Sequence, residues 1–277
     1  MGLTLQHVGY TYAAGTSLAQ PALSDVCLVL EPGELVLVLG ATGSGKSTLM
    51  RIAAGLLEPE AGVIQIDGAP LTRATARGAV GLVFQDAESQ LFAETLAADV
   101  AFGPRNLGVA AASVDQRVDE ALAMVGLPPS EYAERSPFTL SGGEARRAAI
   151  AGVLAMRPRY LLLDEPTAGL DARGRSAIRD AIATARRESG VVVVSHSAEE
   201  FLDRADRVLL LAGGATAFSG GARELVDDPA RFAEAGLAAP TLLRVQQLSR
   251  KAGHDPGEFS LDPCAVAMAL AVAGGWR

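Results

Sequence analysis

The sequence predicts an α/β fold, and three features of the chain support this prediction. Short apolar runs have the length and composition of buried strands. Segments with helical patterns separate these runs, an alternation typical of a sheet covered by helices. A glycine-rich loop joins one apolar run directly to a helix. The predicted buried strands cover residues 34–39, 79–84, 159–163 and 191–196.

The composition is that of a folded chain with an acidic balance. Of its 277 residues, 49% are hydrophobic and 20% are charged, so the chain can bury a substantial core in one large domain or two small ones. Its net charge of −8 argues against a nucleic-acid partner, because such binding usually needs a basic face. Cys27 and Cys264 lie far apart without metal-ligand spacing, and we expect buried, reduced thiols.

No secretory or membrane-spanning segment is expected. Residues 1–12 lack the basic and apolar regions of a signal peptide. No window of about 18 consecutive apolar residues occurs, and the apolar segment 264–273 is too short to cross a bilayer. We therefore expect a soluble protein that meets a membrane only through a partner.

The chain begins with predicted strands and two tyrosines. Residues 3–8 alternate between apolar and polar, which indicates a half-buried strand, and residues 22–30 and 62–68 also read as strands. Tyr10 and Tyr12 precede the glycine loop. With that loop nearby we interpret Tyr12 as a platform for adenine, whereas an ordinary half-buried tyrosine would otherwise be the default.

The glycine loop spans residues 40–48 and has the sequence GATGSGKST. Its glycines allow backbone N–H groups to form a nest for phosphate oxygens, and the helix that follows adds partial positive charge. Only two lysines accompany 22 arginines, so lysine at position 46 suggests a need for a compact ammonium that reaches the β- and γ-phosphates. Ser47 is expected to take one Mg²⁺ position. The predicted ATP-binding residues here are Gly40, Gly43, Ser44, Gly45, Lys46, Ser47 and Thr48.

Polar residues and helical segments follow the next strand. Gln85 comes directly after the strand at 79–84, where a glutamine can coordinate Mg²⁺ or orient the attacking water, although polar residues commonly end strands. Residues 90–103 have partly helical character, with Pro104 closing the segment. Residues 113–125 form an amphipathic pattern that Ser113 and Gln116 could open as a capping box.

A second anion-receptive helix start is predicted at Ser141. This serine is a plausible N-cap of a helix that runs through Arg146 and Arg147 to about Met156. Gly142 and Gly143 leave backbone N–H groups free for a ligand.

Two carboxylates and a histidine follow later strands. Asp164 and Glu165 are adjacent at the end of a buried strand, which is unfavourable unless they serve something charged. We interpret Asp164 as the carboxylate that holds Mg²⁺ and Glu165 as the general base for the attacking water. His196 ends the predicted strand at 191–196, and we expect it to donate a hydrogen bond to the γ-phosphate, although a structural histidine is the usual default.

The remaining elements are mostly helical. A tight turn at residues 168–171 precedes a predicted helix at about 172–188, and Gly213 and Gly214 indicate a hairpin. The tail beyond residue 251 contains prolines and glycines, which predict a looser annex. The other predicted helices cover residues 221–227, 229–235 and 240–251.

Taken together, these motifs resemble the ATP-binding subunits of ABC transporters over roughly residues 2–235. The family signature is matched by LSGGE at residues 140–144, where glutamate replaces the more usual glutamine. The other matches are residues 40–48 with Walker A, Gln85 with the Q-loop, residues 161–165 with Walker B, residues 169–171 with the D-loop, and His196 with the switch histidine.

The resemblance implies a P-loop NTPase of ABC-ATPase type. Its core sheet would be mainly parallel, with an antiparallel β subdomain and, at about residues 86–157, a helical subdomain carrying the signature motif. The ATPase domain would cover residues 1–235, and residues 236–277 would form a helical extension of the kind used for dimerisation. Two subunits would pack head to tail around ATP and Mg²⁺. The residues acting in trans would be Ser141, Gly142, Gly143 and Asp171.

Residues 88–95 and 99–108 resemble the segment after the Q-loop in the ATPases of energy-coupling factor transporters. In that group the segment lies beside the groove that receives coupling helices. The resemblance implies an ATP-hydrolysing subunit on the cytoplasmic face of the membrane. It would power uptake of a vitamin, or of cobalt or nickel ions, through a membrane coupling subunit and a substrate-binding membrane subunit, with no nucleic-acid partner.

Three alternatives stay open at the level of sequence. The chain could serve another ABC importer or an exporter. It could be a soluble ABC ATPase of DNA repair or translation, although it lacks long coiled-coil insertions and a second cassette. It could also be a nucleotide-sensing scaffold, against which Glu165 and His196 argue. The transported substrate and the choice between homodimer and heterodimer are open as well, and residues 88–92 favour a heterodimer.

Overall fold

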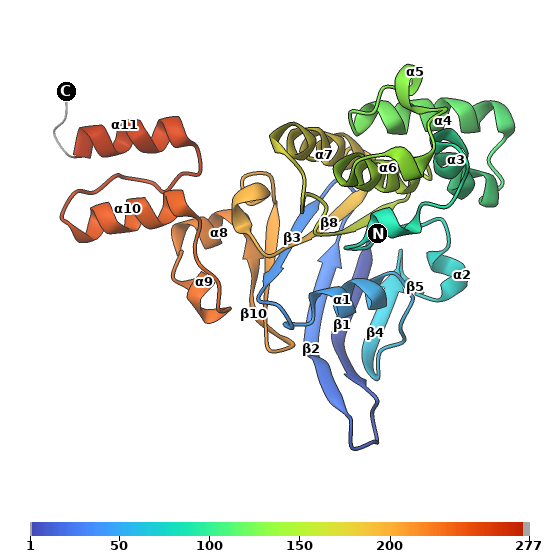
Figure 1. The fold of residues 1–277 in the computed structure, drawn as a ribbon. Helices are drawn as coiled ribbons and strands as arrows, with labels where there is room; N and C mark the ends of the chain where they lie inside the picture. The colour runs from blue at the N-terminus through green and yellow to red at the C-terminus, as the bar shows by residue number, and fades with distance from the viewer. Residues whose placement is uncertain (1, 274–277) are drawn as a thin grey trace.

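A six-stranded sheet forms the centre of the computed structural model, which describes residues 2–273 (Figure 1). Its strand order is β10-β9-β3-β8-β7-β6, and all neighbouring strands are parallel except β10, which pairs with β9 in the antiparallel sense. The mainly parallel core sheet predicted from the sequence is therefore confirmed. Its strands are β3 (Leu35–Gly40), β6 (Val80–Val83), β7 (Tyr160–Asp164), β8 (Gly190–Ser195), β9 (Arg207–Ala212) and β10 (Ala215–Gly221).

Three strands of this sheet are buried along their whole length. Every residue of β3, β7 and β8 is buried, as expected for continuous apolar runs in a sheet covered on both faces. In β3, Leu37 and Leu39 join one apolar cluster, while Val36 and Val38 join another on the opposite face. Each buried side chain of this size contributes roughly 1.5–3 kcal/mol, so these strands fix the sheet in position.

A second sheet is antiparallel and has the order β2-β1-β4-β5. It confirms the expected antiparallel β subdomain. Leu3 and Leu5 of β1 share an apolar cluster with Leu49 and Met50 of helix α1 (Lys46–Ala53), which joins this sheet to the core. The strands are β1 (Leu3–Tyr12), β2 (Gln20–Leu30), β4 (Ala61–Ile66) and β5 (Ala69–Pro70).

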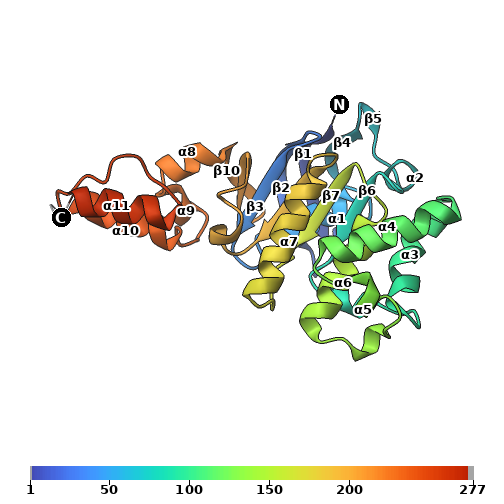
Figure 2. The ribbon, with the colours of Figure 1, turned by 90° about the horizontal axis from the view of Figure 1, so that it is seen from above.

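A group of helices lies together near the β6 edge of the core sheet (Figures 1 and 2). Helix α6 contacts α3, α4 and α7, and α4 also contacts α7. Short helices η1 (Ala87–Gln90) and η2 (Pro137–Thr139) lead into this group, and η3 (Ala198–Glu200) follows β8. The α-helices before β8 are α2 (Arg73–Ala76), α3 (Leu96–Asn106), α4 (Ala111–Met124), α5 (Pro129–Tyr132), α6 (Gly142–Leu154) and α7 (Ala172–Ala185).

Three local expectations are wrong. Pro104 lies inside α3, which continues to Asn106, because a proline removes only one N–H donor near the end of a helix. Helix α4 begins before Ser113, at Ala111, so Ser113 does not cap it. Cys27 and Cys264 are exposed, because Cys27 faces outward between two inward-facing residues of β2 and Cys264 lies at the start of the terminal helix.

The C-terminal segment projects from the end of the molecule where β9 and β10 lie (Figures 1 and 2). The tail is more regular than expected, because residues 263–273 form a helix that packs on α10. The Gln246 side chain of α10 is buried and bonds both the N–H and the carbonyl of Ser260, which lies in the segment that joins the two helices. Among the described residues, no helix is long and apolar enough to cross a membrane. The segment contains α8 (Ala222–Asp227), α9 (Arg231–Glu234), α10 (Thr241–Lys251) and α11 (Pro263–Ala273).

Candidate nucleotide-binding site

A cleft of about 390 Å³ opens at the carboxyl edge of the core sheet. The loops after β3, β6, β7 and β8 meet there, because parallel strands end at the same edge. The antiparallel sheet supplies the remaining wall through β1 and β2. The lining residues are Tyr12, Gln20, Pro21, Ala22, Thr42, Gly43, Gly45, Lys46, Ser47, Thr48, Gln85, Asp164, Glu165, Ala168 and His196.

The glycine loop between β3 and α1 needs glycine for a steric reason. Gly45 caps α1 with a φ of 100°, a conformation that residues with a Cβ rarely adopt. A Cβ at this position would lie 2.5 Å from the carbonyl oxygen of Ala22. The tight approach leaves the first N–H groups of α1 directed at the cleft without a side-chain cap. Such a helix start favours anions.

Lys46 lies at the mouth of this loop. Its Nζ donates hydrogen bonds to the carbonyl oxygens of Gly40 and Ala41, at 2.7 and 3.0 Å. Burial lowers the pKa of Lys46 from its ordinary value, although the negative charges of Glu165 and Asp164 oppose this shift. The ammonium therefore sits between loop carbonyls and two carboxylates, where an anionic phosphate can approach it.

Ser47 and Asp164 form a pair of oxygen donors beside Lys46. The Ser47 hydroxyl donates to Oδ2 of Asp164 at 2.8 Å. Asp164 is buried, and its burial raises its pKa, while the Ser47 hydrogen bond and the Lys46 charge act in the opposite direction. A cation at this position would relieve the cost of the buried carboxylate. Hydroxyl and carboxylate oxygens suit Mg²⁺.

Glu165 and His196 face each other across the ends of β7 and β8. Oε2 of Glu165 lies 2.9 Å from Nδ1 of His196. The Glu165 backbone has a φ of 51°, which is unusual for a residue with a side chain, and its N–H donates to the carbonyl of Val194 at 3.0 Å. A strained backbone beside a cleft often accompanies function, and here it orients the carboxylate toward the histidine.

Tyr12 and Gln85 also line the cleft. The Tyr12 hydroxyl lies 3.2 Å from Oγ1 of Thr48, and Tyr10 packs edge-on against the Tyr12 ring with centroids 5.0 Å apart. Gln85 follows β6 and also lines a smaller hollow that it shares with Asp164. Of the predicted residues, Gly40 ends β3 behind the loop, and Ser44 is buried in it.

The four residues assigned to act in trans lie outside this cleft, at the N-termini of α6 and α7. Ser141 caps α6, where its hydroxyl accepts a hydrogen bond from the N–H of Glu144 and where Gly142 and Gly143 form the first turn. Asp171 caps α7 by accepting from the N–H of Gly174 at 2.7 Å. The structure thus separates the two predicted phosphate-binding regions within one chain.

Sequence reasoning missed several residues. Gln20, Pro21 and Ala22 line the cleft because β2 pairs with β1 and runs beside the glycine loop, a contact without a local signal. Arg146 is also unexpected: it lies on α6, is buried, and donates to the backbone carbonyls of Gln85 and Glu165. Its position in a polar run predicts a solvent-facing side chain instead.

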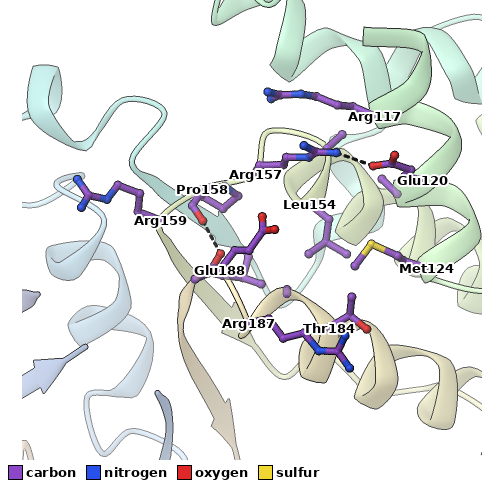
Figure 3. A pocket seen from close by; sticks show the side chains of 15 residues that line it. Arg117, Glu120, Met124, Leu154, Arg157, Pro158, Arg159, Thr184, Arg187 and Glu188 are labelled. Atoms are coloured by element: carbon purple, nitrogen blue, oxygen red, sulfur yellow. Dashed lines mark hydrogen bonds and ion pairs between the residues drawn. The ribbon is translucent and has the colours of Figure 1, made fainter. Parts of the chain in front are cut away.

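A second pocket, of about 360 Å³, lies at the opposite edge of the sheet (Figure 3). It is bounded by the loops that precede β7 and β8, and Leu154 and Met124 contribute apolar side chains to it. On its rim, Arg157 forms an ion pair with Glu120 at 2.5 Å. Arg117 extends from α4 and Arg187 from the turn after α7, and the two side chains do not converge on a common point (Figure 3). None of the predicted nucleotide-binding residues lines this second pocket; those that line a pocket line the cleft at the carboxyl edge of the sheet.

The fold and the cleft define a P-loop nucleotide-binding protein, and comparison with known proteins refines this class. The family model described as ABC transporter matches residues 23–168. A solved structure of CbiO1 from Clostridium perfringens, described as part of an ABC transporter complex, shares 31% identity with a TM-score of 0.73, covering 88% of this chain and 98% of that one. A dimeric ATP-binding cassette bound to ADP and Pi shares 29% identity with a TM-score of 0.71, covering 80% and 99%. The chain belongs to the ATP-binding subunits of ABC transporters, and it is an ATPase.

Curated relatives narrow the assignment within that family. The energy-coupling factor transporter ATP-binding protein EcfA2 of Symbiobacterium thermophilum is 46% identical over 99% of this chain and 95% of its own length. The EcfA2 protein of Lacticaseibacillus paracasei is 41% identical over the full length of both chains. This chain therefore groups with the energy-coupling factor ATPases, which confirms the subfamily predicted from residues 88–108.

Proposed function

We propose that this chain hydrolyses MgATP as one of two ATPase subunits of an energy-coupling factor transporter. The observation that carries the proposal is the separation of the two phosphate-binding regions. Lys46 and Ser47 line the cleft, while Ser141, Gly142 and Gly143 lie outside it at the start of α6. A second ATPase subunit, identical or related, supplies its own signature residues and Asp171 to complete the site.

ATP is held mainly by the glycine loop and its flanks. The N–H groups at the start of α1 and the Lys46 ammonium bind the β- and γ-phosphates. Tyr12 lies at the far end of the cleft on β1, where its ring stacks on adenine. This arrangement leaves the γ-phosphate near Glu165 and His196.

The oxygen donors of the cleft fit Mg²⁺. Ser47, Gln85 and Asp164 supply a hydroxyl, an amide and a carboxylate. We propose that phosphate oxygens and water supply the remaining ligands, as is usual for Mg²⁺. When bound, Mg²⁺ neutralises charge on the phosphate oxygens.

Glu165 is the general base, and His196 holds it in position. The Glu165 carboxylate accepts a proton from the attacking water while the water oxygen bonds to the γ-phosphorus and the bond from that phosphorus to the β–γ bridging oxygen breaks, which releases ADP. His196 contacts that carboxylate through Nδ1, and its Nε2 donates to the γ-phosphate when both ring nitrogens carry a proton. Gln85 orients the water.

An apolar pocket of about 390 Å³ supports a membrane coupling partner. Phe92 and Phe102 line it, with exposed fractions of 58% and 50%, and their rings contact edge to face at 4.9 Å. The pocket lies between α3 and α6, and the residues from Gln90 to Phe92 that line it follow shortly after Gln85 in the chain. Movement of a coupling helix in this pocket can therefore displace Gln85 in the nucleotide site. We propose that a helix of the coupling subunit binds in this pocket.

The same proposal includes the location of the chain in the cell and the substrate that the transporter carries. The chain is held at the cytoplasmic face of the membrane by its coupling subunit, and a separate membrane subunit binds the cargo. We propose a vitamin or a cobalt or nickel ion as that cargo. Helices α10 and α11 form a C-terminal extension whose exposed Leu248 and Met268 suit contact with a second ATPase subunit.

The direct test replaces Glu165 by Gln in the full-length chain. The variant should bind ATP with wild-type affinity but hydrolyse it at least about 100-fold more slowly, because the amide cannot accept the proton. A Glu188→Gln variant, outside the cleft, serves as the matched control. Hydrolysis by Glu165→Gln at the wild-type rate would remove Glu165 from the role of base.

A further inference from the structure

Arg146 places a buried positive charge directly behind the catalytic edge. The side chain leaves α6 one turn after the signature glycines and is 8% exposed. Its Nη2 donates to the carbonyl oxygen of Glu165 at 2.9 Å and also to the carbonyl oxygen of Gln85. Oε2 of Glu88 lies 3.9 Å from Nη1. Burial of a guanidinium is costly unless the group is paired and hydrogen-bonded, and these contacts offset that cost.

The carbonyl of Glu165 belongs to a backbone that needs restraint. Glu165 has a φ of 51°, in the left-handed region that side chains disfavour. On one side its N–H is bound by Val194, and on the other its carbonyl is bound by Arg146. The two contacts fix the peptide groups that flank the Glu165 Cα, and hence the direction in which the carboxylate leaves the chain toward His196.

The same nitrogen of Arg146 connects this backbone with the Q-loop. Gln85 follows β6 and Glu165 follows β7, so their carbonyls belong to loops from neighbouring strands. Glu88, three residues after Gln85, lies within η1, which leads into the Phe92 pocket. A displacement of the Q-loop or of α6 therefore moves the group that holds the Glu165 backbone.

We propose that Arg146 is a positioning residue for ATP hydrolysis. Its guanidinium keeps the Glu165 carboxylate aligned with the attacking water and ties that alignment to the Q-loop and the signature helix. The inference rests on the proposed role of Glu165 as general base. It assigns Arg146 no contact with ATP, and it attributes the main effect of Arg146 on hydrolysis to the Glu165 backbone.

A double-mutant cycle tests this claim in the full-length chain with its co-purifying subunits. Arg146→Met should lower kcat at least 10-fold, change the Kd for ATP less than 2-fold, and lower the residual single-turnover rate of Glu165→Gln less than 2-fold. Equal losses in the wild-type and Glu165→Gln backgrounds would overturn the inference. If Arg146→Met does not fold, Arg146→Lys is used in the same cycle, because it keeps the charge but lacks the planar group.

Arg186→Ala is the matched control. Arg186 also binds backbone carbonyls, those of Gly33 and Arg204, and pairs with Asp206, but it lies away from the cleft. Its loss should lower Tm with kcat changed less than 2-fold, and an equal loss of kcat in this control would assign the effect of Arg146 to general destabilisation. Absence of ATP hydrolysis by the wild-type complex would instead contradict the proposed function, so the two failures are distinguishable.

Discussion

Single residues of the signature helix are held more tightly than the sequence indicates. Oε2 of Glu144 accepts from both the N–H and the hydroxyl of Ser141, and Oε1 accepts from the Tyr132 hydroxyl. Glutamate thus closes a capping box while anchoring α5 to α6. The departure from the usual glutamine keeps the geometry of the signature serine and adds a charge.

The charge of Glu144 gives a pH prediction. The Ser141 N–H and the Tyr132 and Ser141 hydroxyls lower the pKa of Glu144 from 4.5 to about 2. Because the folded pKa is depressed, this stabilisation is present above pH 4.5 and is lost as the pH falls toward 2. The Tm difference between wild type and Glu144→Ala should therefore be largest above pH 5 and shrink from pH 4.5 downward. A difference independent of pH would exclude the charge as its source.

A second prediction at this scale concerns Gly45. Gly45→Ala introduces strain at a φ of 100° and a Cβ that contacts Ala22, so it should cost at least about 1–3 kcal/mol and abolish ATP binding. Gly236→Ala is the control, because Gly236 has a φ of 68° with no atom within 4 Å of an added Cβ. The control should lose stability but keep ATP binding, as measured by denaturant unfolding and nucleotide titration. ATP binding by Gly45→Ala at wild-type affinity would contradict the proposed fit of the loop.

At the scale of elements, the proposed surface for the coupling subunit lies between α3 and α6. Phe92→Ser and Phe102→Ser should abolish co-purification of the membrane coupling subunit, because each removes an exposed aromatic side chain from the apolar pocket. ATP binding should remain. Val63→Ser, an equally exposed apolar position on β4, should leave the complex intact. Unchanged co-purification in both phenylalanine variants would place the coupling surface elsewhere.

Elements also show how far the sequence predicts the fold. Buried strands and the polar residues that follow them were predictable, because apolar runs define β3, β7 and β8 and because parallel strands bring Lys46, Asp164 and His196 to one edge. Arg146 and the β2 wall were not predictable, because their contacts join segments distant in sequence. Local periodicity also gave no indication that Pro104 lies inside a helix.

At the scale of the whole molecule, one chain presents two separate halves of a nucleotide site. The glycine loop and Glu165 line a cleft, while Ser141 caps a helix outside it. Both regions use helix N-termini, which favour phosphate, and under the proposed function each is half of a site that closes between subunits. The central claim is therefore that ATP is bound tightly only between two chains.

Retention of ATP by the assembled complex tests this claim most directly. In the Glu165→Gln background, ATP is trapped and its stoichiometry is counted with labelled nucleotide after removal of free ligand. Adding Ser141→Arg should release at least one of the two retained ATP molecules, because the bulky cation blocks the helix start that covers the partner's γ-phosphate. Full retention of both ATP molecules by the double variant, with its fold intact by Tm, would contradict a site shared between chains.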